Sequence, residues 1–167
     1  EKALPSADVL GSLTPGLAHL VHMPSHIYLR TGQFNKGTAI NFDAVNRFKE
    51  YNALYPAVSA SAFLYLLHNQ HMLANCAMHA GRYHDAITTA HELAQSIDSA
   101  SLSMPPPMGS ALQYLYMTSA LLNVRFEKWD SLLSMQKPDS QFIYANVLYH
   151  FGRGMALVAN NRVDEAK

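Results

Sequence analysis

The chain has 167 residues; its 12 basic side chains balance 12 acidic ones, and only 14% of positions are charged. That balance excludes the basic surface with which proteins grip phosphate backbones, so we predict no nucleic-acid partner. No apolar run reaches the roughly 18–20 residues of a membrane span, and the single cysteine, Cys76, excludes an internal disulfide. We expect one soluble domain over residues 1–167, in the cytoplasm or the periplasm, two compartments that the composition does not distinguish.

Helix-favouring residues dominate, and no alternating run of polar and apolar residues lies between hairpin turns, which predicts an all-α fold. Thr14 and Pro15 are typical of a helix start, and Gly32 is typical of a helix end. Pro24 lies inside this first helix and cannot bond the carbonyl of Leu20, so we expect a kink there. The expected helices cover residues 14–31, 35–50, 62–80, 83–99, 110–124, 129–135 and 142–159, and another begins at 163.

Four turns of similar composition divide these helices into pairs. They are Gly32-Gln33-Phe34, Gly81-Arg82-Tyr83, Glu127-Lys128-Trp129 and Asn161-Arg162-Val163. Their spacings are 49, 46 and 34 residues. A 34-residue period of helix, turn, aromatic residue and helix is the tetratricopeptide signature, and the chain resembles that family. The two longer intervals exceed this period by 15 and 12 residues, which loops around residues 55–56 and 105–107 would supply.

Residues 15–28, PGLAHLVHMPSHIY, followed by Arg30 and Gly32, resemble a block in a group of bacterial tetratricopeptide proteins with no settled activity. The resemblance implies an α-α superhelix of antiparallel helix pairs, with irregular loops between the repeats. It also implies that the first helix of each pair lines a concave groove. The chain opens without Met, and Arg162 to Lys167 resemble the beginning of a helix, so we expect a fragment of a longer repeat protein.

The pattern His-x-x-His-Met occurs twice, at residues 19–23 and 68–72, in the same register before a turn. At about 100° per residue, His19, His22 and His26 fall within about 60° of one another, while the apolar residues cluster elsewhere on the wheel. We therefore expect the histidines to face away from the core. By resemblance this face lines the groove, and the predicted ligand-binding residues are His19, His22, His26, Arg30, His68, His71, Asn75 and His79.

The polar register fades toward the C-terminus. The equivalent positions of the third and fourth pairs hold Tyr114, Met117, Leu121, Leu148, Phe151 and Met155. Equivalent helices of neighbouring repeats pack about 8–10 Å apart, so the histidines of the first two pairs are expected to converge.

Three kinds of chemistry suit such a face. Our main hypothesis is a scaffold that binds a peptide, a protein or an acidic small ligand through His, Arg and Asn side chains, as tetratricopeptide grooves commonly do. The alternative is a site for zinc, copper or nickel, because neutral imidazole is a favoured ligand of these ions. Its candidate ligands are His19, His22, His26, His68 and His71. We lean against a histidine-dependent enzyme, since no nucleophile or carboxylate accompanies these histidines.

Overall fold

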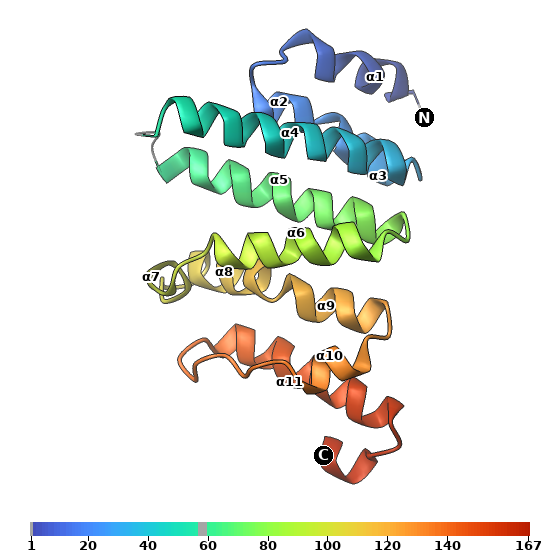
Figure 1. Ribbon diagram of the computed structural model, residues 1–167, viewed down its shortest axis with the longest axis vertical. Helices are drawn as coiled ribbons and strands as arrows, with labels where there is room; N and C mark the ends of the chain where they lie inside the picture. Colours follow the sequence, from blue (N-terminus) through green and yellow to red (C-terminus); the bar gives the residue numbers. More distant parts are fainter. Residues whose placement is uncertain (1, 57–59) are drawn as a thin grey trace. The chain divides into compact units, whose positions relative to one another are not determined.

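The computed structural model describes residues 2–56 and 60–167, and every regular element in these ranges is helical (Figure 1). The helices are α1 (Leu4–Leu13), α2 (Ala18–His22), α3 (Pro24–Arg30), α4 (Phe34–Leu54), α5 (Ala60–His79), α6 (Tyr83–Gln95), α7 (Ser99–Leu102), α8 (Met108–Tyr116), α9 (Thr118–Arg125), α10 (Trp129–Leu133) and α11 (Ile143–Ala159), followed by a 3-10 helix, η1 (Val163–Ala166). The predicted all-α class is confirmed. Within the described part of the chain, none of the helices has the length and apolar character needed to cross a membrane.

The four predicted turns share one backbone geometry. Their first residues have positive φ angles: 76° at Gly32, 74° at Gly81, 55° at Glu127 and 59° at Asn161. In each turn the next residue's N–H donates to a carbonyl five residues earlier, at 2.8–2.9 Å. This is the Schellman arrangement that ends a helix, so the sequence alignment of the turns is confirmed.

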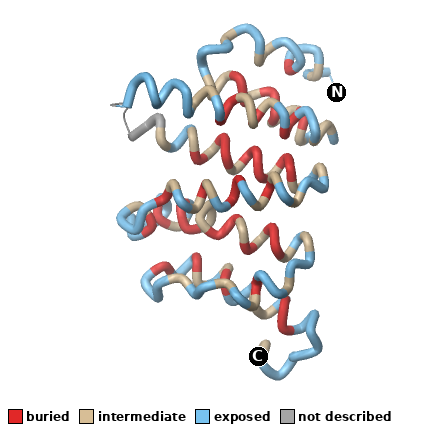
Figure 2. The backbone as a smooth tube through the Cα atoms, in the orientation of Figure 1, coloured by how far each residue is buried: buried red, intermediate tan, exposed pale blue. Residues whose placement is uncertain are grey.

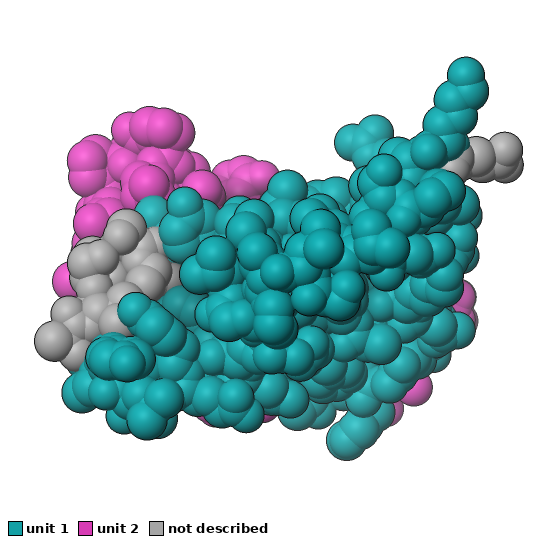
Figure 3. Space-filling view, turned by 90° about the horizontal axis from the view of Figure 1, so that it is seen from above, with its two compact units in different colours: residues 1–89 teal, residues 90–167 magenta. Residues whose placement is uncertain are grey.

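The chain forms two compact units, unit 1 over residues 1–89 and unit 2 over residues 90–167 (Figure 3). The boundary falls between Thr89 and Ala90, inside α6. In unit 1, α5 packs against α4, and most residues of α5 between Leu67 and Ala77 are buried (Figure 2). The superhelix and the single domain expected from the sequence stay predictions.

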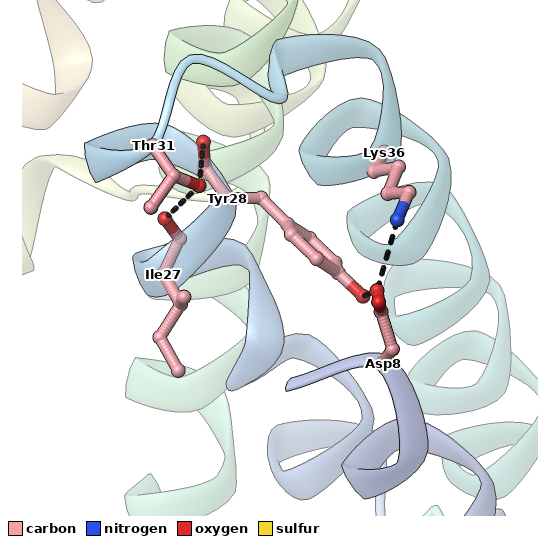
Figure 4. A network of polar contacts seen from close by, with 5 residues as sticks. All are labelled: Asp8, Ile27, Tyr28, Thr31 and Lys36. Carbon is pink, nitrogen blue, oxygen red and sulfur yellow. Dashed lines mark hydrogen bonds and ion pairs between the residues drawn. The ribbon is translucent and has the colours of Figure 1, made fainter. Parts of the chain in front are cut away.

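Helix α1 was not predicted. The carboxylate of Asp8 connects it to the rest of unit 1 (Figure 4). The Asp8 Oδ1 atom accepts a hydrogen bond from the Tyr28 hydroxyl at 2.8 Å and an ion pair from Lys36 Nζ at 2.9 Å. The predicted helix start at Thr14 is wrong, because Pro15 lies in a turn between α1 and α2. Arg47 Nη1 holds that turn by donating to the Pro15 carbonyl at 2.8 Å.

Pro24 breaks the first predicted helix, as expected from its missing N–H. Helix α2 ends at His22, Met23 forms a turn, and Pro24 opens α3. Two other predicted helices are shorter in the structure than expected. The segment 110–124 splits at Met117 into α8 and α9, and the segment 83–99 ends at Gln95 as α6.

Unit 2 is joined internally by the buried side chain of Gln113. Its Nε2 donates to the Leu102 carbonyl at 2.9 Å, and its Oε1 accepts from the N–H groups of Tyr144 and Ala145 at 2.9 and 3.2 Å. These N–H groups belong to the first turn of α11, whose own N-cap residue makes no side-chain bond. Gln113 therefore satisfies donors that a helix N-terminus leaves unpaired.

Candidate metal centre

Four imidazole rings from α2, α3 and α5 meet in unit 1. The ring of His22 lies with its centroid 4.9 Å from those of His19 and His26 and 4.7 Å from that of His68. His68 is also 5.5 Å from His26 and 5.8 Å from His19. Because α2 and α3 adjoin the break at Pro24 and α5 packs against both, residues far apart in sequence converge. The two His-x-x-His-Met copies thus contribute to one cluster.

Three of these histidines are placed to share an ion. His22, His26 and His68 each offer one ring nitrogen, and these nitrogens lie within 4.8 Å of one another. Around a tetrahedral zinc with bonds of about 2.0–2.1 Å, ligand nitrogens are about 3.3 Å apart. Side-chain rotations that bring the nitrogens closer by at most about 1.5 Å would therefore complete a three-imidazole site. The triad can hold a metal ion.

Asn41, on α4, orients the central ligand. Its amide nitrogen donates to the Gly37 carbonyl at 2.8 Å, which leaves Oδ1 to face His22 Nδ1 at 3.2 Å. Since that oxygen can only accept, His22 carries its proton on Nδ1 and presents a lone pair on Nε2. Ser25 Oγ donates to the same oxygen at 3.5 Å. This is how proteins commonly hold a ligating imidazole from its second nitrogen.

The burial of His22 contradicts the prediction that the histidines face away from the core. Its side chain is 0% exposed, because α1, α4 and α5 all pack against α2. A wheel drawn for one helix assumes a single buried face, whereas α2 is covered on several sides. His19, His26 and His68 are partly buried, so the cluster runs from the interior toward the surface.

Burial favours the neutral form of His22, His26, His68 and His71. Desolvation, followed by the charge of His68, lowers the pKa of His22 to about 3. Desolvation is also the main reason that the pKa values of His26 and His68 are lowered, and it lowers the pKa of His71 to about 4. Neutral imidazole is the form that binds metal, so the cluster remains competent below the pH at which ordinary histidines protonate.

His19 lies beside the triad and is held by an aromatic neighbour. Its ring centroid is 4.4 Å from that of Tyr65, an exposed residue three positions before His68 on α5. His19 Nδ1 and His22 Nε2 are both buried, and neither has a hydrogen-bond partner among the described residues. Buried polar atoms are costly when unpaired, so these nitrogens favour a ligand between the rings.

The remaining predicted residues lie at varying depths. His71 is partly buried and close enough for the charge of His68 to act on it, and Asn75 is also partly buried. Arg30 and His79, which share a register position, are both exposed. The His79 ring lies 5.2 Å from that of Phe34, which places it against the turn at Gly32. The structure therefore gathers four of the eight predicted residues into the ring cluster.

Sequence reasoning missed Asn41 and Tyr65. Asn41 follows His22 by 19 positions and lies on another helix, so no spacing rule links the two. Its signal is weak: one amide in a stretch of α4 whose neighbours Ala44 and Val45 are buried. Tyr65 precedes the second histidine motif by three residues, the helical spacing of side chains that share a face.

The junction of α4 and α5 is close because Gly37 has no side chain. A Cβ atom there would approach Cys76 Sγ to 2.8 Å, closer than such atoms can pack. Burial raises the pKa of the Cys76 thiol to about 11, and Asn41 Nδ2 lies 3.7 Å from its sulfur. Cys76 is thus a neutral, buried packing residue that brings α5 toward the Asn41–His22 pair.

Comparisons with known proteins do not assign the chain to a family. No family model, curated protein or solved structure matches the chain. The tetratricopeptide resemblance stays a prediction.

Proposed function

We propose that the protein binds one divalent transition-metal ion through His22, His26 and His68. The observation that carries this proposal is the convergence of three ring nitrogens within 4.8 Å, with the second nitrogen of His22 held by Asn41. The unpartnered Nε2 of His22 supports it further, because ligation would satisfy an atom that is otherwise buried and unpaired.

The donor set favours zinc, copper or nickel. Imidazole nitrogen suits these ions, whereas magnesium and calcium prefer oxygen ligands, which the triad lacks. Three neutral imidazoles can accept a tetrahedral ion and leave its fourth position open. The ion would join α2 and α3 on either side of Met23 to α5, so binding should stabilise unit 1.

Metal titration of tag-free protein tests the proposal, with zinc and copper added to the metal-stripped chain and followed by calorimetry. We expect one ion per chain, and at least a hundredfold weaker binding in His26→Ala and His68→Ala, because each keeps only two ligands. Both residues are partly exposed, so these variants should fold, which circular dichroism would verify. His91→Ala is the matched control, as His91 is exposed on α6. Equal affinity in all four proteins would overturn the proposal.

A peptide scaffold is the second candidate, and exposed apolar residues beside the histidines favour it. Leu64 is 43% exposed and Tyr65 is 49% exposed, and they precede His68 by four and three positions on α5. Such residues offer apolar contact to a ligand whose carboxylate meets the histidines or Arg30. This candidate predicts that acidic peptides bind equally well with and without a chelator. Peptide binding that vanishes on metal removal would assign the primary role to the ion.

A further inference from the structure

The charge around the triad is one-sided. An ion held by three neutral imidazoles keeps its full double positive charge, because no ligand supplies a negative one. Among the described residues, the cluster that could hold an ion consists of His22, His26 and His68, and no carboxylate belongs to it. A metal bound by these three side chains would therefore have no negatively charged ligand among the described residues.

Arg30 adds a further positive charge at the rim. It follows His26 by four residues on α3, and side chains at this spacing share a helix face. The pKa of His26 lies below its usual value, first because of burial and then because of the charges of His19 and Arg30, in keeping with this spacing. Arg30 is exposed, and it forms no ion pair with a carboxylate among the described residues.

His19 borders the site without belonging to the triad. Its ring lies tilted against that of Tyr65, while its Nδ1 is buried and has no hydrogen-bond partner among the described residues. A group seated between the metal and the rim would give this nitrogen a hydrogen-bond partner. These features together suit an anion. They are an open coordination position, a metal charge that no ligand balances, the unpaired guanidinium of Arg30 and the unpaired imidazole nitrogen of His19.

We infer that the metal-loaded site binds a small oxyanion, a carboxylate or a phosphate, with one oxygen on the ion and another on Arg30. The inference rests on the proposed metal function. It identifies the histidine cluster as a ligand-binding centre in which the metal supplies most of the attraction and Arg30 the orientation. A purely structural ion would instead be closed to outside ligands.

Cobalt substitution gives a direct test, because the visible absorption of tetrahedral Co²⁺ changes when its fourth ligand changes. The Co²⁺-loaded protein would be titrated with acetate and with inorganic phosphate in a non-coordinating buffer. We expect a saturable spectral change with at least one anion, and about tenfold weaker binding in Arg30→Gln, the usual weight of one charge-assisted bond. The cobalt affinity itself should stay within twofold of wild type.

Arg125→Gln is the matched control, because Arg125 is exposed and holds the same position before the Glu127 turn as Arg30 does before Gly32. A response to acetate alone would indicate carboxylate ligands, and a response to phosphate alone would indicate phosphates. No spectral change with either anion, or equal weakening in both arginine variants, would overturn the inference. A response that appears only in His19→Ala would also overturn it, because His19 would then be the fourth ligand. Failure to bind cobalt or zinc at all would remove the metal proposal as well.

Discussion

Units 1 and 2 use the same turn geometry to position different chemistry. At the register of His22, the second repeat holds His71, the third holds Met117 and the fourth holds Phe151. His22 is 0% exposed and Met117 is 3% exposed. The same buried position is therefore occupied by a polar imidazole in unit 1 and by an apolar thioether in unit 2. The same register position therefore has different chemistry in the two units.

The two units also differ in how their buried polar groups are satisfied. In unit 2 the amide of Gln113 is fully engaged in three hydrogen bonds. In unit 1 the Nδ1 of His19, the Nε2 of His22, the amide of Asn69 and the Oε1 of Gln70 lack partners among the described residues. Unit 2 also contains one such atom, Asn146 Oδ1. Unpaired buried polar atoms cost stability, and the ion that we propose would restore part of that cost in unit 1.

The largest expected effect comes from breaking the polar junction of unit 2. Gln113→Ala would leave the Leu102 carbonyl and the N–H groups of Tyr144 and Ala145 unpaired, at a cost of about 3 kcal/mol in the free energy of unfolding. Chemical denaturation measures this loss, with the exposed Gln141→Ala as control. A loss no larger than that of the control would show that the junction does not hold unit 2 together.

Metal addition should act on unit 1 with nearly the same magnitude. At an ion concentration 100 times the dissociation constant, binding to the folded state alone adds about 2.7 kcal/mol to the unfolding free energy. We expect this gain in wild type and in Gln113→Ala, and a gain of at most about 0.4 kcal/mol in His68→Ala, whose binding is at least a hundredfold weaker. A full gain that survives in His68→Ala would place the ion elsewhere.

Acid should destabilise the apo protein, because His22 is neutral when folded. Its pKa is about 3 in the folded state and 6.5 in an unfolded chain. Below pH 6.5 the unfolded chain therefore binds a proton at His22, whereas the folded chain does not. Stability is therefore full above pH 6.5 and falls by about 2 kcal/mol between pH 7 and pH 5 through His22 alone.

Denaturation curves at several pH values would measure that slope. His22→Gln should lower it by about this amount, while His84→Ala, which changes an exposed residue of α6, should leave it unchanged. The same slope in all three proteins would show that His22 titrates normally in the folded state.

The smallest effect concerns the turns, where unit 1 uses glycine and unit 2 uses Glu127 and Asn161. Glu127 has a φ of 55°, a conformation that costs residues with a Cβ about 1 kcal/mol. Glu127→Gly should raise the free energy of unfolding by about 0.5–1 kcal/mol, and Gly81→Ala should lower it by about 1 kcal/mol. The melting temperature should shift in the same direction in each variant. Opposite signs in thermal melts are the expected result, and changes of one sign would contradict it.

Local signals predicted the helix ends well, and tertiary packing explains what they missed. The Gly32 and Gly81 turns depend on glycine's freedom at positive φ, a property of single residues that the sequence displays. Helix α1 and its Asp8 contact depend on residues 20 and 28 positions away, which no periodicity shows.

The histidine site divides in the same way. The repeated motif predicted that His19, His22, His26, His68 and His71 converge, because one register placed on neighbouring helices brings side chains together. The rings of the first four meet, whereas His71 is near enough only for the charge of His68 to act on it. The burial of His22 and its support by Asn41 were not accessible, since both require knowing which helices cover α2.

X-ray absorption on zinc-loaded protein tests the central claim most directly, because it reports the atoms bound to the metal. The account predicts one zinc per chain with three imidazole nitrogens at about 2.0–2.1 Å and a fourth ligand that is an oxygen and not an imidazole. Replacing His22, His26 and His68 together should abolish zinc retention, while replacing the exposed His84 and His91 should not. Zinc that is not retained by the wild-type chain, or a coordination shell unchanged in the triple variant, would contradict the assignment.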